Sequence, residues 1–215
     1  MRRPAEDSVE SSGECCPRPA SPPVAPLFPL PGFFLFPGSI VPLHIFEPRY
    51  CQMIDDLIDG NGRLVMGTVP DEFSTQLPGS PPVHPVAGLG EIARHEKLPD
   101  GRRYLIWLFG IGRVHVREVQ SDRLYRRVSY EPLKETPLPG GPCRASLRAE
   151  LEECVRARCR ELQELPADLA DACLIDILIQ KLQLPSSETL RLYSEPCLER
   201  RAHCALAAHA SKPVE

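Results

Sequence analysis

No two cysteines of this 215-residue sequence stand in the C-x-x-C spacing, although nine cysteines are present. Structural zinc sites of the ribbon, finger and RING types take paired cysteine or histidine ligands at short, regular spacings. The cysteines here are scattered from residue 15 to residue 204, and their number is odd. We therefore expect reduced thiols that pack as small apolar side chains, with neither a metal site nor a disulfide framework.

The sequence also lacks the motifs by which many enzymes bind phosphate or activate a nucleophile. It contains no G-x-x-x-x-G-K-[ST] phosphate loop, no G-x-S-x-G elbow and only four lysines. The pair His95-Glu96 begins like the zinc motif H-E-x-x-H, but Pro99 stands where the second histidine belongs. These absences predict a protein that is not an enzyme, with no catalytic residues and no cofactor.

An unbroken apolar helix long enough to cross a membrane is missing as well. The longest apolar run, LFPLPGFFLFPGSIVPLHIF, covers residues 27–46 and contains Pro29, Pro31, Pro37 and Pro42. Each proline inside a helix costs about 3 kcal/mol, so this run cannot span a bilayer as one helix. Acidic residues precede it where a secretory signal would be apolar. We expect a soluble, cytoplasmic protein without membrane contacts.

An excess of positive charge is absent from the chain as a whole, whose net charge is −4 and whose pI is near 5.9. This balance disfavours nucleic acid as the main partner. Residues 86–130 are locally basic, with nine basic and five acidic side chains. An RNA-binding surface on this segment is the alternative hypothesis, and a solvated sheet face is the simpler interpretation.

Composition and periodicity divide the chain into four parts. Residues 1–25 are acidic, serine-rich and proline-rich, which predicts a disordered tail. Residues 26–131 alternate as strands do, with one short helix expected after Glu47-Pro48. Residues 132–145 form a linker rich in proline and glycine, and residues 146–210 have helical apolar spacing. The expected class is α+β, a β domain followed by a small helical bundle.

Three stretches together resemble the amino-terminal substrate-binding domain of the Lon protease family. PLFPLPGFFLFPGSIVPLHIFEPRY resembles the opening signature of that family. VAGLGEIARHEKLPDGRRYLIWLFGIGRVHVREV resembles its G-x-G-x-I hairpin and the strand that follows, and YRRVSYEPL resembles its closing strand. The helical end is similar as well, so the resemblance covers about residues 26–208.

The resemblance implies a PUA-like β pseudo-barrel joined to a helical subdomain. It also implies a module that binds unfolded or apolar polypeptide segments and serves as an adaptor to a protease or chaperone. The ATPase and peptidase domains of full Lon proteases have no counterpart in these residues, so proteolytic activity is not expected.

Five residues are the candidates for contact with a polypeptide partner. Phe33, Phe34 and Phe36 cannot all point the same way on a strand, because successive side chains alternate between its faces, so we expect at least one in the core and one facing outward. Glu47 and Arg49 open the expected helix, where the resemblance makes substrate contacts plausible. Capping of the helix by Glu47 is the competing interpretation.

Overall fold

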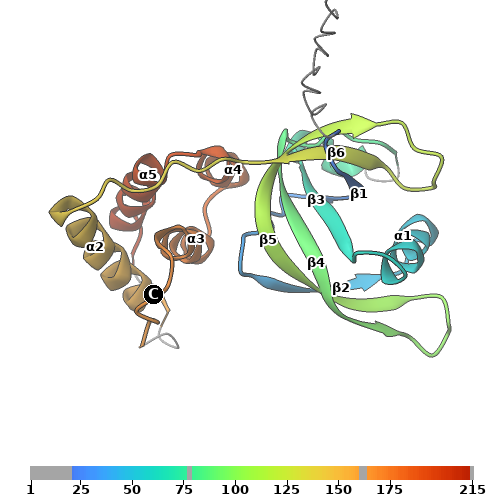
Figure 1. Cartoon of the computed structure of the whole chain (residues 1–215), viewed down its shortest axis with the longest axis horizontal. Coiled ribbons are helices and arrows are strands. Elements are labelled where there is room, and N and C mark those ends of the chain that lie inside the picture. The colour runs from blue at the N-terminus through green and yellow to red at the C-terminus, as the bar shows by residue number, and fades with distance from the viewer. Residues whose placement is uncertain (1–20, 77–78, 160–163, 214–215) are drawn as a thin grey trace, which may run out of the picture.

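The computed structural model describes residues 21–76, 79–159 and 164–213. A β barrel occupies one side of the molecule and a group of helices the other (Figure 1). The predicted α+β class is confirmed. The described elements are β1 (Val24–Pro31), β2 (Ile40–Ile45), α1 (Pro48–Ile58), β3 (Arg63–Val69), the 3-10 helix η1 (Asp71–Gln76), β4 (Val86–Lys97), β5 (Tyr104–Val119), β6 (Arg127–Pro132), α2 (Pro142–Arg158), α3 (Asp171–Leu182), α4 (Ser186–Ser194) and α5 (Leu198–Ala210).

The sheet closes on itself because its longest strand has two neighbours along one edge. The strand order is β2-β5-β4-β3-β1-β6, and β5 also pairs with β6. β1 and β3 run parallel, while the other paired strands are antiparallel. Residues 104–109 of β5 pair with β2, and residues 114–119 pair with β6. β2 is therefore an edge strand, a position that tolerates Pro42.

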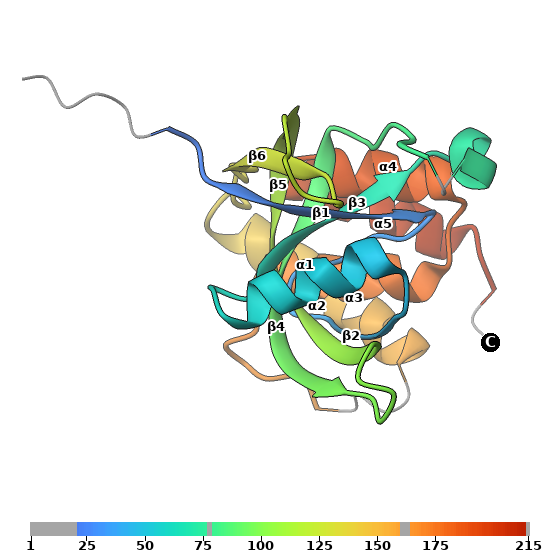
Figure 2. The same ribbon diagram turned by 90° about the vertical axis from the view of Figure 1, so that its right-hand side faces the viewer.

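Helix α1 packs against the barrel on the side away from the other helices (Figures 1 and 2). Pro48 stands at its first turn, as the sequence predicts, and its buried face consists of Tyr50, Met53, Ile54 and Leu57. These side chains join the barrel core. Tyrosine hydroxyls of the barrel also donate hydrogen bonds to the carboxylates of this helix, such as Tyr125 to Asp56 at 2.8 Å.

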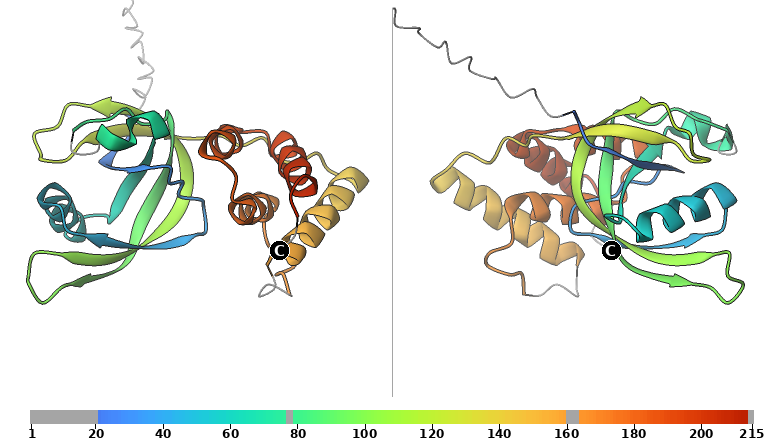
Figure 3. Two further views of the ribbon diagram at one scale, coloured as in Figure 1. Left: turned by 180° about the vertical axis from the view of Figure 1, so that it is seen from behind. Right: turned by 45° about the vertical axis from the view of Figure 1, so that its right-hand side comes forward.

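Helices α2 to α5 surround a core that extends into the barrel. Leu151, Val155, Leu174 and Ile179 are among its fully buried members. Phe36, which precedes β2, belongs to the same cluster, together with residues of the barrel and of the linker. Figure 3 shows these helices gathered on one side of the barrel in both views. The helical subdomain therefore depends on side chains from the β half for part of its core.

The predicted boundaries shift at two places. β1 begins at Val24, and Ala25 is only 3% exposed, so the last residues of the predicted tail belong to the barrel. α2 begins at Pro142, inside the predicted linker, and ends at Arg158. Residues 1–20 lie outside the described residues. No helix among the described residues is long and apolar enough to cross a membrane.

Candidate functional site

Residues 32–39 pass between the barrel and the helices, and they follow a bent path rather than a strand. The chain turns at Gly38, whose φ of +79° is one that residues with a side chain rarely adopt. Ser39 closes the turn by donating from Oγ to the Phe36 carbonyl at 2.6 Å. A Cβ at Gly110 of β5 would lie 2.1 Å from that same carbonyl oxygen, so the segment rests directly on the strand. The prolines and glycines of this apolar stretch thus allow the chain to bend and to lie close against the strand.

Tyr193 of α4 holds this segment from the helical side. Its hydroxyl donates to the Leu35 carbonyl at 2.6 Å, a bond that is buried. Its ring lies 5.0 Å from the Phe36 ring in an edge arrangement and 5.2 Å from the Phe34 ring. Burial raises the pKa of the Tyr193 hydroxyl well above its usual value, so it remains a hydrogen-bond donor. One tyrosine thus fixes three consecutive residues of the segment.

A shallow recess, here called the junction groove, lies between this segment and helices α3 and α4. Its volume is about 290 Å³, and it opens to solvent. Apolar side chains from both subdomains face it, with amide and hydroxyl groups at its margin. The lining residues are Gly32, Phe33, Phe34, Phe36, Ile179, Gln180, Gln183, Leu184, Ser186 and Thr189.

The three candidate phenylalanines meet at the junction groove, but they do not divide as strand alternation predicts. Phe36 is 4% exposed and lies in the helical core. Phe34 packs partly against that core, while Phe33 packs partly against the barrel core. None of the three faces fully outward, because the segment is not a strand and each residue takes its own direction. Phe33 and Phe34 keep part of their surface at the groove.

Glu47 and Arg49 lie at the start of α1, the helix on the opposite side of the barrel from α3 and α4 (Figure 1). Glu47 occupies the N-cap position, yet its side chain makes no capping bond. Its carboxylate instead pairs with the Arg49 guanidinium at 2.9 Å. The capping interpretation therefore holds for the backbone only. Arg49 also donates to the Gly79 carbonyl and lies 4.5 Å above the Tyr50 ring.

A second recess, the α1 hollow, lies beside these two residues and was missed from the sequence. Its volume is about 620 Å³. Phe46, directly before Glu47, lies at the edge of this hollow. It is 63% exposed, although its side chain is large and apolar. The lining residues are Phe46, Pro48, Cys51, Gln52, Asp55, Lys97, Asp100, Gly101, Arg102 and Arg103. Phe46 ends the apolar stretch, but nothing in the local sequence shows that its ring faces solvent.

The charges around the α1 hollow are largely paired with one another. Asp100 accepts hydrogen bonds from the backbone of Arg102 and from Arg103, which lowers the pKa of its carboxyl to about 2. The Lys97 ammonium lies 3.6 Å from the Asp55 carboxylate. These pairs fix the β4–β5 turn beside the helix. The hollow therefore offers an apolar edge at Phe46 within a charged frame.

The basic segment 86–130 does not form a free basic face. Six of its nine basic side chains make ion pairs with nearby carboxylates, as Arg126 does with Glu118 at 2.7 Å. Arg113 is buried and points toward the helices rather than toward solvent. This arrangement gives no support to the RNA-binding alternative. The six paired residues are Arg94, Lys97, Arg103, Arg113, Arg123 and Arg126.

Residues 24–207 match the family model described as the ATP-dependent protease La (LON) substrate-binding domain. Among curated proteins, Lon protease 2 of Sorangium cellulosum is 30% identical over 149 residues, which are 67% of this chain and 18% of that protein. Lon protease of Syntrophomonas wolfei is 22% identical over 199 residues, or 88% of this chain and 24% of that protein. The chain thus spans less than a quarter of these relatives.

Two solved structures share the fold. The Lon N-terminal domain protein from Xanthomonas campestris superposes with a TM-score of 0.62 at 24% identity, covering 86% of this chain and 98% of that one. The N-terminal domain of the Mycobacterium avium complex Lon protease gives a TM-score of 0.61 at 13% identity, covering 89% of this chain and all of that one. At these identities the likeness concerns the fold alone.

Proposed function

Because the chain belongs to the Lon substrate-binding domain family, we propose that it is a non-enzymatic module that binds unfolded or apolar polypeptide segments. The substrates of an ATP-dependent protease are polypeptides, and the matching family model describes the part that binds them. The sequence contains no phosphate loop, so we do not assign it ATP hydrolysis.

The observation that carries this proposal is the junction groove, where aromatic side chains remain partly exposed between two subdomains. A volume of about 290 Å³ is near the lower limit for small-molecule sites, and it suits one or two side chains of an extended peptide. Apolar contact contributes about 25 cal/mol per Å², from which the cost of ordering a flexible ligand is subtracted. We therefore expect weak binding, with a Kd of about 1 μM or higher.

The test is the binding of fluorescein-labelled β-casein, an unfolded probe, measured by fluorescence anisotropy. Gln180 lies on the exposed margin of the groove, where an arginine would place a charge against an apolar ligand. Gln180→Arg should weaken casein binding by about tenfold because burying an unpaired charge is costly. Gln120→Arg makes the same change at an exposed site away from the groove and serves as the matched control. Equal affinities for both variants would place the binding site elsewhere.

The role of adaptor to a protease or chaperone is the finer part of the proposal. It is supported by the membership in a protease family and by the absence of an ATP-binding motif in this sequence. Affinity purification from native extract, with proteins and RNA identified in parallel, tests it. Recovery of a protease or chaperone in the wild-type sample, with loss of bound clients in Gln180→Arg, is the expected result. Specific recovery of RNA instead would contradict it.

A further inference from the structure

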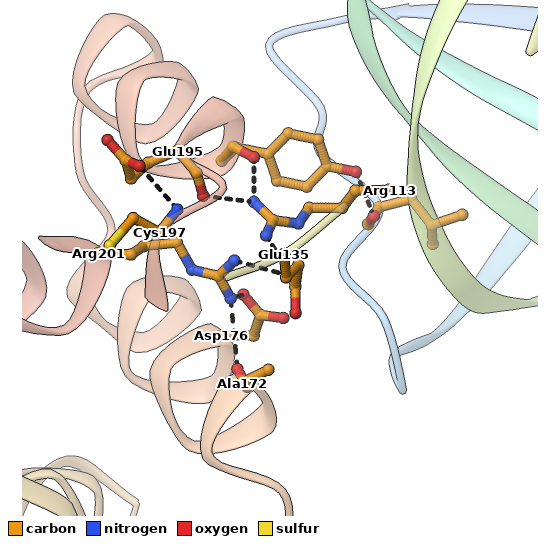
Figure 4. Close-up of polar contacts among 9 residues, drawn as sticks. Arg113, Glu135, Ala172, Asp176, Glu195, Cys197 and Arg201 are labelled. Carbon is orange, nitrogen blue, oxygen red and sulfur yellow. Dashed lines mark hydrogen bonds and ion pairs between the residues drawn. The ribbon is translucent and has the colours of Figure 1, made fainter. Parts of the chain in front are cut away.

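A buried network of charged side chains joins the two subdomains (Figure 4). Arg113 comes from the barrel strand β5, Arg201 from α5 and Asp176 from α3. Glu135 comes from the linker between the subdomains. Both guanidinium groups are almost completely buried, at 1% and 0% side-chain exposure, and the two carboxylates balance their charge.

Glu135 is the member that joins the halves. Its Oε1 accepts from Arg113 and, at 3.2 Å, from Arg201. Arg201 continues to the Asp176 carboxylate at 2.6 Å. The linker is fixed on both sides of Glu135, because Leu133 donates to the Arg113 carbonyl at 2.8 Å and Thr136 exchanges backbone bonds with the start of α5. The Glu135 carboxylate of the linker thus binds one guanidinium group from each subdomain.

The network is not the arrangement that stability alone would favour. In the described part of the chain, the Nε atoms of Arg113 and Arg201 are buried without a hydrogen-bond partner. Unsatisfied buried donors cost free energy, and buried ion pairs often contribute less than apolar side chains of similar size. What the network supplies is a fixed geometry, because the guanidinium forks bind only in a narrow range of orientations.

Tyr193 connects this network to the groove. Its carbonyl accepts a hydrogen bond from Arg113, while its hydroxyl holds Leu35 and its ring contacts Phe34 and Phe36. The same residue therefore touches the ionic network on one side and the groove floor on the other. These contacts form a continuous path from Arg113 through Tyr193 of α4 to residues 34–36.

We propose that the ion pairs of Glu135 with Arg113 and Arg201 act as a latch that holds the two subdomains together. We further propose that this latch sets the geometry of the junction groove through Tyr193. The latch is a conformational device in its own right. Its effect on polypeptide binding rests on the proposed function. Glu135 is also the accessible member, with a side chain 31% exposed, so a change there reaches the network without first opening the core.

Hydrogen–deuterium exchange of the full chain tests the latch without any ligand. Two sets of amides report on it: Leu133 and Thr136 in the linker, and Gly38 and Ser39 beside the groove, all of which donate backbone bonds. Glu135→Gln keeps the shape of the side chain and removes its charge. It should raise exchange about tenfold at both sets. Glu131→Gln, on the exposed end of β6, should leave both unchanged.

A second variant separates the two halves of the proposal, including the case in which Glu135→Gln does not fold. Tyr193→Phe removes only the bond to Leu35, so it should loosen Gly38 and Ser39 while Leu133 and Thr136 keep wild-type exchange. If Glu135→Gln loosens the linker amides but not the groove amides, the coupling through Tyr193 is wrong. If it loosens neither, or if Tyr193→Phe does not loosen the groove amides, the latch is overturned.

Casein binding then distinguishes this inference from the proposed function. Glu135→Gln should weaken the binding of fluorescein-labelled β-casein by about threefold, because a mobile groove floor must be ordered again by the ligand. If the wild-type chain does not bind casein while the exchange results follow the expected pattern, the latch stands and the proposed function fails. If casein binds but the exchange pattern is absent, the proposed function stands and the latch fails.

Discussion

Three phenylalanines that stand within four positions of one another occupy three different environments. Phe36 is buried in the helical core, Phe34 lies between that core and solvent, and Phe33 lies against the barrel. Truncation to alanine should therefore lower the free energy of unfolding by different amounts at the three positions, even though the residues are chemically identical.

Phe36→Ala should lower the free energy of unfolding by about 3–5 kcal/mol, because it empties a buried site and removes the ring contact with Tyr193. Phe33→Ala should cost less, since part of its ring already faces solvent at the groove. Urea denaturation followed by circular dichroism measures both values. Equal losses for the two variants would show that the groove is closed in solution.

Asp176 should make the stability of the folded chain depend on pH. Burial raises the pKa of its carboxyl to about 6 from 3.8, while Arg201 and Arg113 lower it and Glu135 raises it. Between these values the folded chain binds a proton that the unfolded chain does not, so this group's contribution to stability falls as pH rises through about 6. Burial lowers the pKa values of His84 and His209. Their contribution to the pH dependence of stability therefore has the opposite sign, because stability rises as pH rises through their titration range.

A comparison with Asp176→Asn isolates this effect, because both histidines remain in the variant. Lowering the pH from about 7 to about 5 should raise the melting temperature of the wild type relative to that of the variant. Thermal denaturation of both proteins across this range is the measurement. A constant difference between the two would mean that Asp176 stays ionised throughout, held by Arg201.

At the scale of elements, α1 and the β4–β5 turn enclose a recess in which one aromatic ring is largely exposed. Phe46 contributes little to the core, yet it forms the apolar edge of the α1 hollow. The neighbouring pair of Glu47 and Arg49 is positioned by the first turn of the helix. Besides the junction groove, this surface offers a polypeptide a recess with an exposed aromatic ring.

Phe46→Ala should change the melting temperature by no more than about 2 °C, because the ring is already exposed. If the α1 hollow contributes to client capture, the same variant should weaken casein binding by about threefold, and Glu47→Gln with Arg49→Gln should have a smaller effect. Anisotropy titrations give these affinities. Leu124→Ala, at another exposed apolar residue, is the control. Unaltered binding in Phe46→Ala would leave the junction groove as the site.

Local patterns predicted those elements that local interactions determine. The alternation of β4 and β5, the proline that opens α1 and the apolar spacing of α3 all led to the observed structure. The direction of Arg113 was not predictable in this way. Within the basic segment it resembles its exposed neighbours, and only the helices that arrive about 80 residues later, at Tyr193 and Glu195, explain its burial.

The candidate site was predictable to a similar degree. The apolar stretch itself indicated a functional surface, and the structure does place Phe33, Phe34 and Phe36 around one groove. The other wall of that groove comes from α3 and α4, so its shape depends on packing between distant parts of the chain. Glu135 lies in a stretch whose composition predicts only a linker. Its partners are set by the tertiary fold.

For the whole molecule, the pairing of β1 with β6 shows where the chain can be shortened. β1 joins β6 through Val24, Ala25 and Pro26, and Tyr130 donates to the Pro23 carbonyl at 3.0 Å. A chain that begins at Ser21 keeps these contacts, whereas one that begins at Pro26 loses most of the pairing between β1 and β6. The disordered-tail hypothesis is thus restricted to residues before Ser21.

The shorter chain that begins at Ser21 should melt within about 2 °C of the full chain. The chain that begins at Pro26 should melt several degrees lower, because it loses about two backbone hydrogen bonds and the buried Ala25. Differential scanning calorimetry of the three proteins decides the matter. A large loss in the Ser21 chain would show that the preceding residues pack against the barrel.

The bond between Tyr193 and Leu35 spans 158 positions of the sequence. During synthesis the ribosome releases Phe33, Phe34 and Phe36 long before α4 exists to cover them. Contacts between such distant residues form late, since the loop between them must close first. We therefore expect the nascent chain to expose part of this aromatic segment until α4 has been made, and in that interval the segment is an apolar polypeptide of the kind that chaperones bind.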